Sequence, residues 1–207
     1  MSSQYTDYGY KSGDDPWTTQ YLLPCISRML DERSGPILDL GCGNGSIARR
    51  LLQAGHDVYG VDASPSGISA ASAVAPGRFF VMDVNDRVLP VDLASIRFKT
   101  VISTEVIEHL YDPSLLLRMA RQAMGRSGRL IVSTPYHGYV KNLALALTGK
   151  LDSHFTALWL GGHIKFFSRA SLERLLVQEG YVPDAFVGAG RMPWLWKSMV
   201  IGARLAE

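Results

Sequence analysis

Short apolar segments and helix-like segments alternate along this chain, and their order restricts the fold more than any other feature. Residues 36–40, 57–61 and 78–82 each predict a strand, and segments 46–55 and 66–74 between them carry apolar or small residues suited to helices. Repeated strand–helix–strand units require crossovers that make neighbouring strands parallel and place helices on both faces. The sequence therefore predicts an α/β fold.

The second half of the chain extends the same pattern. Helices are expected through residues 115–124 and after Ser168, which can cap one. Four further strands are predicted at residues 100–103, 128–133, 181–187 and 199–204. We therefore expect a doubly wound, mostly parallel seven-stranded sheet, and a chain of 207 residues is short enough for residues 1–207 to form a single domain.

Two segments fall outside this alternation. Residues 1–30 are expected to form an N-terminal arm and lid helix, and residues 135–167 form a long insertion after the fifth strand. Insertions of this length in compact domains are usually functional, so we interpret this one as a cover over a substrate. The alternative is a helical hairpin that only shields the sheet.

Charge and composition exclude several classes. The formal net charge is +2 and the basic residues are not clustered, so we expect no nucleic-acid partner. No apolar run approaches the length of a membrane span, and residues 1–11 lack a basic start followed by an apolar run, so we expect no stable membrane insertion. The short run 143–147 leaves open a contact with a membrane surface. Two cysteines, Cys25 and Cys42, fit a cytoplasmic location.

A glycine-rich turn follows the first predicted strand. Asp39, Gly41, Gly43 and Gly45 form the pattern D-x-G-x-G-x-G directly before a predicted helix. Glycine permits positive φ angles and lets the backbone approach a ligand closely. Asp62 ends the second strand, where a carboxylate can accept both hydroxyl protons of a ribose. The turn and Asp62 together predict a nucleoside ligand, the alternative being that both acids merely cap turns.

The chemistry of the turn selects among nucleosides. The third glycine comes one residue earlier than in G-x-G-x-x-G, and Ser46 stands at the expected position. Asp39 would repel the pyrophosphate of a dinucleotide but would attract the ammonium group of an amino acid. S-adenosylmethionine carries a ribose, an ammonium group and a sulfonium cation, so it suits these acids better than NAD does.

Four motifs carry a resemblance to a known family. They are ILDLGCGNG at residues 37–45, GVDAS at 60–64, MDV at 82–84 and STEVIEHL at 103–110. In these motifs, over roughly its first half, the chain resembles the class I S-adenosylmethionine-dependent methyltransferases, and within them the group similar to ubiquinone-biosynthesis O-methyltransferases. The resemblance implies a Rossmann-like methyltransferase fold with S-adenosylmethionine as cofactor and S-adenosylhomocysteine as product.

The resemblance also implies where the cofactor binds. Gly41, Cys42 and Gly43 would line its methionine part, and Thr104 would supply backbone contacts below the sulfonium. Asp83 would meet the adenine amino group, although this side chain can equally cap the segment that starts at Asn85. The expected cofactor-binding residues are Asp39, Gly41, Cys42, Gly43, Asp62, Ala63, Met82, Asp83, Val84 and Thr104.

Catalytic residues are expected just after the fourth strand. Glu105, Glu108 and His109 are spaced to share one face of a predicted helix. We expect His109 to act as general base towards a hydroxyl acceptor, with Glu105 as a second catalytic residue. The resemblance suggests a divalent metal at this cluster; the alternative, in which Glu108 and His109 only stabilise the helix, is favoured, so no metal is expected. Three other histidines are rivals for the base: His137, His154 and His163.

Aromatic residues point to the acceptor. Eight of them could wall a pocket, namely Tyr5, Tyr8, Tyr10, Trp17, Phe155, Trp159, Trp194 and Trp196. They favour a small apolar or aromatic molecule methylated on oxygen, although Trp194 and Trp196 are equally suited to core packing. Three other functions stay open: a nucleic-acid methyltransferase, an NAD-linked oxidoreductase and a non-catalytic cofactor-binding module. The first is disfavoured because Thr104, Glu105 and Val106 stand where an N-P-P-Y-type sequence is expected.

Overall fold

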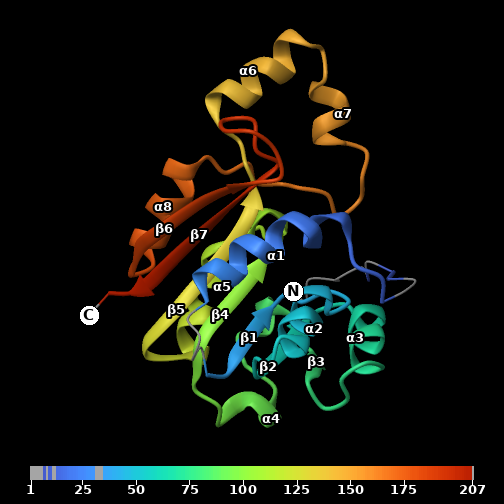
Figure 1. Cartoon of the computed structure of the whole chain (residues 1–207), viewed down its shortest axis with the longest axis vertical. Helices are drawn as coiled ribbons and strands as arrows, with labels where there is room; N and C mark the ends of the chain where they lie inside the picture. Colours follow the sequence, from blue (N-terminus) through green and yellow to red (C-terminus); the bar gives the residue numbers. More distant parts are fainter. Residues whose placement is uncertain (1–6, 8, 11–12, 31–34, 207) are drawn as a thin grey trace.

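A computed structural model describes residues 7, 9–10, 13–30 and 35–206 of the chain. Its centre is a seven-stranded sheet with the order β3-β2-β1-β4-β5-β7-β6 (Figure 1). Strands β1 to β5 are parallel, whereas β7 is antiparallel to both β5 and β6. The predicted mostly parallel, seven-stranded sheet is therefore confirmed. The strands are β1 Ile37–Leu40, β2 Val58–Asp62, β3 Phe79–Val81, β4 Phe98–Thr104, β5 Met124–Pro135, β6 Tyr181–Ala189 and β7 Ser198–Leu205.

The sheet changes its winding direction between β1 and β4. Strand β1 pairs with β2 on one side and with β4 on the other, so the chain leaves β1 towards one edge and later returns to its opposite side. The loops after β1 and β4 therefore diverge and leave a crevice at their carboxyl ends. Ligands of open α/β sheets bind at such a switch point. The glycine turn and Glu105 both lie there.

Helices cover both faces of the sheet. Strand β1 is buried on both sides, with Leu38 and Leu40 in one apolar cluster and Ile37 in the other. Helices α5 and α8 contribute to the first cluster, and α1, α2 and α3 contribute to the second. The helices are α1 Trp17–Met29, α2 Ser46–Gln53, α3 Pro65–Ser72, α4 Val91–Ala94, α5 Ser114–Ala123, α6 Tyr139–Leu147, α7 Leu151–Phe155 and α8 Arg169–Gln178.

Helix α1 is part of the core. It buries Leu22, Cys25 and Ile26 and contacts β6 and β7. The apolar side of α1 packs on the sheet, and the expected lid role of residues 1–30 stays a prediction. Of the segment before it, residues 1–6, 8 and 11–12, with Tyr5 and Tyr8 among them, lie outside the described residues.

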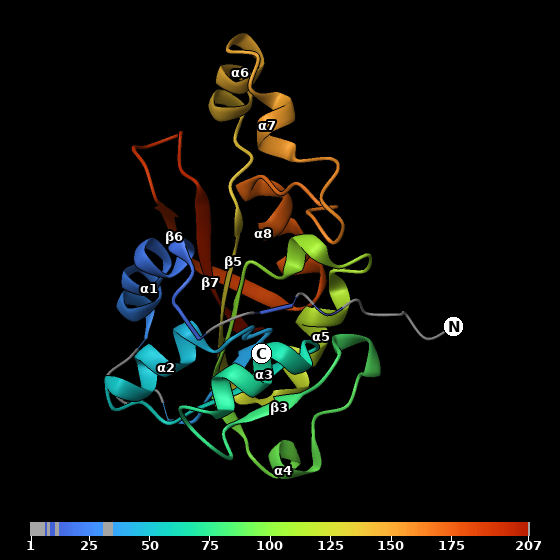
Figure 2. The same cartoon turned by 90° about the vertical axis from the view of Figure 1, so that its right-hand side faces the viewer.

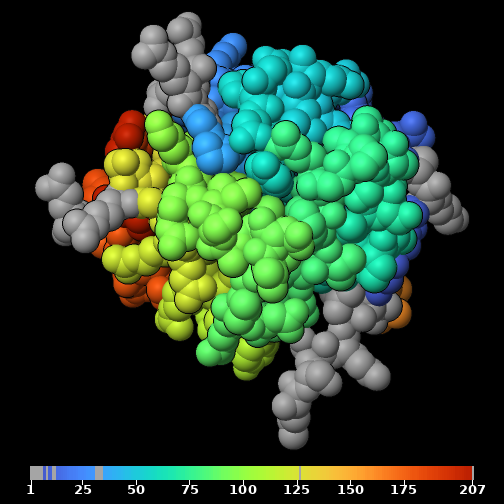
Figure 3. All heavy atoms as spheres, turned by 90° about the horizontal axis from the view of Figure 1, so that it is seen from below, coloured from blue at the N-terminus to red at the C-terminus, as the bar shows by residue number. Residues whose placement is uncertain are grey.

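The predicted insertion stands at one end of the molecule. Helices α6 and α7 rise beyond the carboxyl ends of the parallel strands, above the loop that joins β6 to β7 (Figures 1 and 2). The opposite end is covered by the teal-to-green segments that include α3 and α4 (Figure 3). None of the helices in the described part of the chain combines the length and the apolar character that a membrane span requires. The insertion and the switch point thus share one end of the sheet.

Candidate functional site

The turn after β1 is built from glycines in the left-handed region. Gly41, Gly43 and Gly45 have φ angles of 85°, 54° and 74°. Such angles are unfavourable for other residue types, so the expected conformational role of this motif is confirmed. A Cβ atom on Gly41 would lie 2.4 Å from Cγ2 of Val106, which follows β4. The glycines therefore also allow the turns after β1 and β4 to pack closely.

Asp39 is a buried acid inside β1. Its exposed fraction is 1%, and neither carboxylate oxygen has a hydrogen-bond partner within the described part of the chain. Burial, and to a smaller extent the nearby charge of Asp62, raises the pKa of Asp39 to about 8, while the backbone N–H of Ala48 opposes the rise. A buried carboxylate without a partner is costly to ionise. Asp39 therefore holds a proton at neutral pH, and a cationic ligand group beside it would favour its ionised form.

Asp62, the last residue of β2, connects the glycine turn after β1 to the loop after β2. One carboxylate oxygen accepts the backbone N–H of Gly43 at 2.7 Å, and the other accepts the N–H of Ser64 at 2.8 Å. Burial raises the pKa of Asp62, while these two hydrogen bonds oppose that rise. Since each carboxylate oxygen has two lone pairs, Asp62 retains acceptor capacity for a ligand beside the turn.

The remaining expected cofactor-binding residues lie around the same edge. Asp83 caps a 3₁₀ turn at Val84–Asp86, and its Oδ1 accepts from the backbone and side-chain nitrogens of Asn85 at 2.8 and 2.7 Å. The capping role considered for Asp83 is therefore confirmed, and its contact with adenine stays a prediction. Met82 and Val84 are buried, whereas Ala63 and Thr104 are half-buried.

Cys42 fills space in the turn. It is 7% exposed, and burial raises the pKa of its thiol well above the ordinary value. The reactive form of cysteine is the thiolate, which this environment disfavours. Its expected role as a packing residue beside the ligand agrees with this environment.

The described part of the arm crosses the glycine turn. The carboxylate of Asp7 accepts hydrogen bonds from the hydroxyls of Ser64 and Ser66, and the N–H of Tyr10 donates to Ser66 Oγ at 3.0 Å. A Cβ atom on Gly43 would lie 2.5 Å from the hydroxyl oxygen of Tyr10, so the tyrosine ring packs on the turn. The arm thus covers the backbone that follows β1.

The helix expected around Glu105 is not present. Strand β4 continues to Thr104, Glu105 has a φ of 55°, and only Ile107–His109 form a 3₁₀ turn. The two oxygens of Glu105 accept hydrogen bonds from Ser133 Oγ at 2.8 Å and Ser198 Oγ at 3.0 Å. These bonds hold a conformation that the local sequence disfavours, and such strain is typical of functional sites.

Glu105 is suited to proton transfer. Burial raises its pKa to about 7, while the hydrogen bonds from Ser133 and Ser198 oppose the rise. An acid or base works best when its pKa lies near the working pH. Glu105 therefore meets the chemical requirement for the catalytic role predicted from the sequence.

Glu108 joins the 3₁₀ turn to the insertion. Its side chain is fully buried, Oε2 accepts from Thr134 Oγ1 at 3.0 Å, and burial raises its pKa well above the ordinary value. Its backbone carbonyl accepts the N–H groups of Ile164 and Lys165 at 3.0 and 2.9 Å. Oε1 lies 3.9 Å from Nε2 of both His109 and His163. The insertion thereby brings His163 beside His109.

The tautomer of His109 follows from its contacts. Nδ1 lies 2.8 Å from the carbonyl oxygen of Gly161, and because a carbonyl can only accept, Nδ1 carries the hydrogen. The neutral ring then has its lone pair on Nε2. Burial lowers the pKa of His109, although the contact with Gly161 opposes this. His109 is therefore able to accept a proton, or to bind a metal ion, through Nε2.

Three donor atoms at this place fit a metal ion. Glu108 Oε1, His109 Nε2 and His163 Nε2 lie within 4.8 Å of one another. One carboxylate and two imidazoles are a common ligand set for divalent zinc and iron. The set differs from the cluster considered in the sequence, because His163 takes the place of Glu105. The expectation that no metal binds stays a prediction.

The other histidines and aromatic residues divide into two groups. The rings of His137 and His154 form a cluster with those of Phe155 and Phe166. The ring centroid of Trp159 lies 6.1 Å from that of His109. The other three tryptophans lie elsewhere. Trp196 packs against Tyr136 and Phe186, whereas Trp17 and Trp194 are exposed. The aromatic wall beside His109 therefore comes from the insertion.

A glycine turn follows β1, and the buried Asp39 and the half-buried Asp62 lie near the carboxyl ends of β1 and β2. On a sheet of this order, these features define a Rossmann-like methyltransferase domain. A family model described as a methyltransferase domain matches residues 17–184, so the chain belongs to this family. The predicted family resemblance is confirmed.

Curated relatives carry a more specific name. The ubiquinone biosynthesis O-methyltransferase of Azorhizobium caulinodans is 34% identical over 158 residues, covering 73% of this chain and 60% of the relative. The protein of the same name from Cereibacter sphaeroides is 31% identical over 168 residues, covering 77% of this chain and 66% of the relative. The chain thus spans less than two thirds of the length of these relatives.

Solved structures of methyltransferases have folds similar to that of this chain. A magnesium protoporphyrin IX methyltransferase from Synechocystis with bound S-adenosylhomocysteine has a TM-score of 0.68 at 20% identity, covering 95% of this chain and 91% of that one. An S-adenosylmethionine-dependent methyltransferase from Mesorhizobium loti has a TM-score of 0.64 at 19% identity, covering 87% and 96%. These likenesses confirm the expected Rossmann-like methyltransferase fold.

Proposed function

We propose that this protein is an S-adenosylmethionine-dependent methyltransferase that methylates an oxygen atom of a small apolar or aromatic molecule. Family membership and the names of its relatives support methyl transfer to oxygen. The observation that carries the choice of cofactor is the buried, unpartnered carboxylate of Asp39 beside Asp62. A cationic nucleoside would stabilise the ionised carboxylate, whereas a pyrophosphate would be repelled by it.

The residues around the turn fit this cofactor. Asp62 would hold the ribose hydroxyls, while Asp39 would face the positively charged methionine part along Gly41, Cys42 and Gly43. Met82, Asp83 and Val84 would surround the adenine, Ala63 would adjoin the ribose, and Thr104 would lie below the sulfonium. When bound, the cofactor supplies an electrophilic methyl group. The protein then contributes alignment and exclusion of water, which the insertion and the arm can provide.

Activation of the acceptor falls to residues after β4. The lone pair of His109 Nε2 accepts the proton of the acceptor hydroxyl, which makes that oxygen a stronger nucleophile. Glu105, with a pKa of about 7, is the second group able to take that proton. Trp159 beside His109 supports an aromatic acceptor.

A divalent cation on Glu108, His109 and His163 is a second way to activate the acceptor. The carboxylate oxygen of Glu108 that faces both rings has no hydrogen-bond partner among the described residues, which supports this use. A bound metal lowers the pKa of a coordinated hydroxyl. His109 Nε2 cannot bind a metal and accept a proton at once, so Glu105 would be the base in that case.

We keep the expected partners and location as part of the proposal. A small-molecule acceptor agrees with the names of the relatives, and nucleic acid is not expected. Both cysteines are free and buried, which supports the reducing environment of the cytoplasm.

Calorimetry and labelling test the proposed function. S-adenosylmethionine and S-adenosylhomocysteine are expected to bind, and NAD is not. Methyl-labelled cofactor added to a lysate of the source cells should then label a small molecule. Binding of NAD alone would contradict the proposal in favour of an oxidoreductase. Label recovered only in nucleic acid would indicate a nucleic-acid methyltransferase, and cofactor binding without any labelled product would indicate a binding module.

A further inference from the structure

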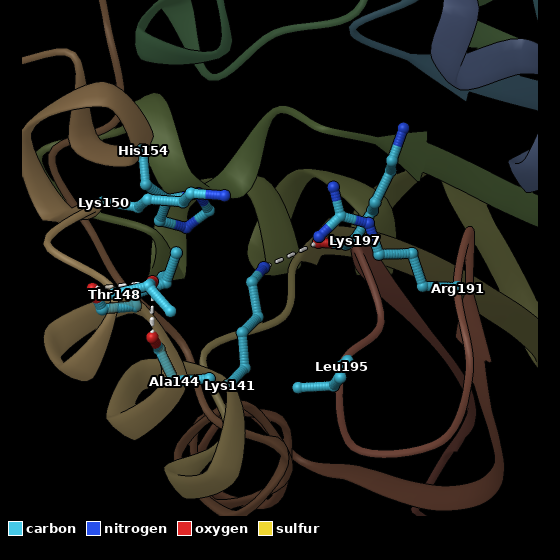
Figure 4. A pocket seen from close by; sticks show the side chains of 9 residues that line it. Lys141, Ala144, Thr148, Lys150, His154, Arg191, Leu195 and Lys197 are labelled. Atoms are coloured by element: carbon cyan, nitrogen blue, oxygen red, sulfur yellow. Dashed lines mark hydrogen bonds between the residues drawn. The ribbon is translucent and has the colours of Figure 1, made fainter.

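A cavity lies between the insertion and the loop that joins β6 to β7. Its volume is about 410 Å³. Residues of α6 and α7 form one wall, and residues 191–197 form the other (Figure 4). Cavities of this size accommodate small organic molecules. The lining consists of Lys141, Ala144, Leu145, Thr148, Lys150, His154, Arg191, Leu195 and Lys197.

The charge of this lining has one sign. Lys141, Lys150 and Arg191 contribute three cations, whereas the ammonium of Lys197 lies over the rings of Trp17 and Tyr21, 4.7 and 5.7 Å from their centroids. No described residue in the lining carries a carboxylate. None of these three forms an ion pair with a carboxylate elsewhere in the described chain. Cations that share a cavity repel one another, and an anion placed among them removes that repulsion.

Lys141 is buried in the wall of the cavity. Its exposed fraction is 7%, and its ammonium donates to the backbone carbonyl of Lys197 at 3.3 Å (Figure 4). Burial and the positive charge of Arg191 lower its pKa to about 8, although the negative charge of Glu105 opposes this. A buried ammonium is unfavourable without a compensating negative charge. The charge of Glu105 offsets part of this cost, and an anionic ligand in the cavity would offset more of it.

The rest of the lining is apolar. Ala144 and Leu145 on α6 and Leu195 in the opposite loop also line the cavity. These side chains suit the carbon skeleton of a small molecule, while the cations suit an oxyanion on it. The cavity therefore fits an anion with an apolar or aromatic body.

The cavity adjoins the catalytic residues. Lys197, whose carbonyl holds Lys141, is followed directly by Ser198, and Ser198 Oγ donates to Glu105 at 3.0 Å. Lys141 and Glu105 also act on each other electrostatically, since the ammonium lowers the pKa of Glu105. A molecule bound in the cavity thus lies on the side of the sheet where Glu105 is held.

We propose that this cavity binds the carboxylate or phosphate group of the methyl acceptor, and this inference rests on the proposed methyltransferase function. Lys141, Lys150 and Arg191 bind the oxyanion, and the apolar lining binds the adjacent carbon skeleton. The proposal narrows the acceptor from any apolar or aromatic molecule to an anionic one.

Calorimetric titration into protein saturated with S-adenosylhomocysteine tests the proposal. The probes are benzoate, phenyl phosphate and uncharged benzyl alcohol. At least one anion is expected to bind roughly tenfold or more tightly than the alcohol, and comparison of the two anions distinguishes carboxylate from phosphate. The double variant Lys150→Gln/Arg191→Gln, which changes two exposed side chains, should lose roughly tenfold or more of the anion affinity and retain its affinity for S-adenosylhomocysteine.

A matched variant controls for the loss of two positive charges. Arg28→Gln/Lys99→Gln changes two exposed residues outside the cavity and should leave anion binding unchanged. Lys141→Gln gives a second measurement from inside the wall. Equal affinity for the anions and the alcohol, or an equal loss in the control variant, would overturn the proposal.

The same titrations separate this proposal from the proposed function. Protein that binds S-adenosylhomocysteine but not the anions keeps its methyltransferase function and loses the anionic acceptor. Protein that binds anions but not S-adenosylhomocysteine has an anion site that does not serve a methyl acceptor, which overturns the proposal together with the function.

Discussion

Replacing Asp39 by asparagine should change how stability depends on pH. The carboxyl group has an ordinary pKa of 3.8 and a pKa of about 8 in the fold, because it is buried and lies near the charge of Asp62. Between these values the folded chain holds a proton that the unfolded chain has lost. Folding is therefore favoured by protons, and the free energy of unfolding falls as pH rises towards 8.

The size of this effect follows from the linkage between protonation and folding. One extra proton on the folded state lowers the free energy of unfolding by about 3 kcal/mol between about pH 5 and about pH 7. Asp39→Asn removes the titrating group and keeps the side-chain size. Other buried acids with raised pKa values, such as Glu105 and Asp62, titrate in both proteins. The difference between the two stability curves therefore isolates Asp39.

Urea unfolding at several pH values measures this difference. The wild-type protein is expected to lose stability relative to Asp39→Asn as pH rises from about 5 to about 7, by about 3 kcal/mol. S-adenosylhomocysteine at saturation should reduce the difference, because its ammonium group stabilises the ionised carboxylate of Asp39. Parallel curves for the two proteins would refute the claim that Asp39 is buried without a compensating charge.

Four further substitutions test the site. Asp62→Ala should weaken binding of S-adenosylhomocysteine at least roughly tenfold in calorimetry, because two ribose hydrogen bonds are lost. His109→Ala should lower kcat roughly a hundredfold in a methyl-transfer assay and leave cofactor affinity within about twofold, because it removes a base and no cofactor contact. Glu105→Gln should abolish any rise of kcat through about pH 7, where the glutamate loses its proton. Gly41→Ala should lower stability in urea by about 2 kcal/mol or more, since φ is positive and Val106 blocks the new methyl group.

Each expectation has an outcome that contradicts it. If Asp62→Ala binds S-adenosylhomocysteine with unchanged affinity, the ribose does not bind to that carboxylate. If His109→Ala has the same kcat as the wild type, His109 is not the base. A pH profile of Glu105→Gln that matches the wild type would assign the titration to another group. For Gly41→Ala, the added variant Val106→Ala should restore part of the stability, and no restoration would mean that Val106 does not cause the clash.

The sheet and the glycine turn could be predicted because local sequence determines both. Strands buried on both faces appear as short apolar runs, such as Ile37–Leu40, and the crossovers between them leave few topologies. The turn needs positive φ angles at Gly41, Gly43 and Gly45, and glycine is the residue that permits them. Asp39 and Asp62 could be predicted as site residues because both lie at or near the ends of predicted strands.

The catalytic region could not be predicted in the same way. The pattern from Glu105 to His109 has helical spacing, but Glu105 is held by Ser133 and Ser198, which lie 28 and 93 residues further along the chain. His163 reaches His109 because the insertion folds back onto the carbonyl of Glu108. These are tertiary contacts, which the local periodicity of the sequence cannot predict.

The basic cavity is also a tertiary feature. Lys141 lies within a mostly apolar helical segment, and Arg191 follows the end of β6, so neither residue belongs to a recognisable motif. Only the position of α6 above the loop between β6 and β7 brings them together (Figure 1). The basic residues of the insertion and of this loop were the available signal in the sequence, because residues of both segments line the same cavity.

A crystal structure with S-adenosylhomocysteine tests the central claim most directly. We expect its ribose hydroxyls on the carboxylate of Asp62 and its amino-acid part beside Gly41 and Gly43, with its ammonium group near Asp39. The account would be contradicted if Asp62 contacted only the N–H groups of Gly43 and Ser64 while the nucleoside bound elsewhere.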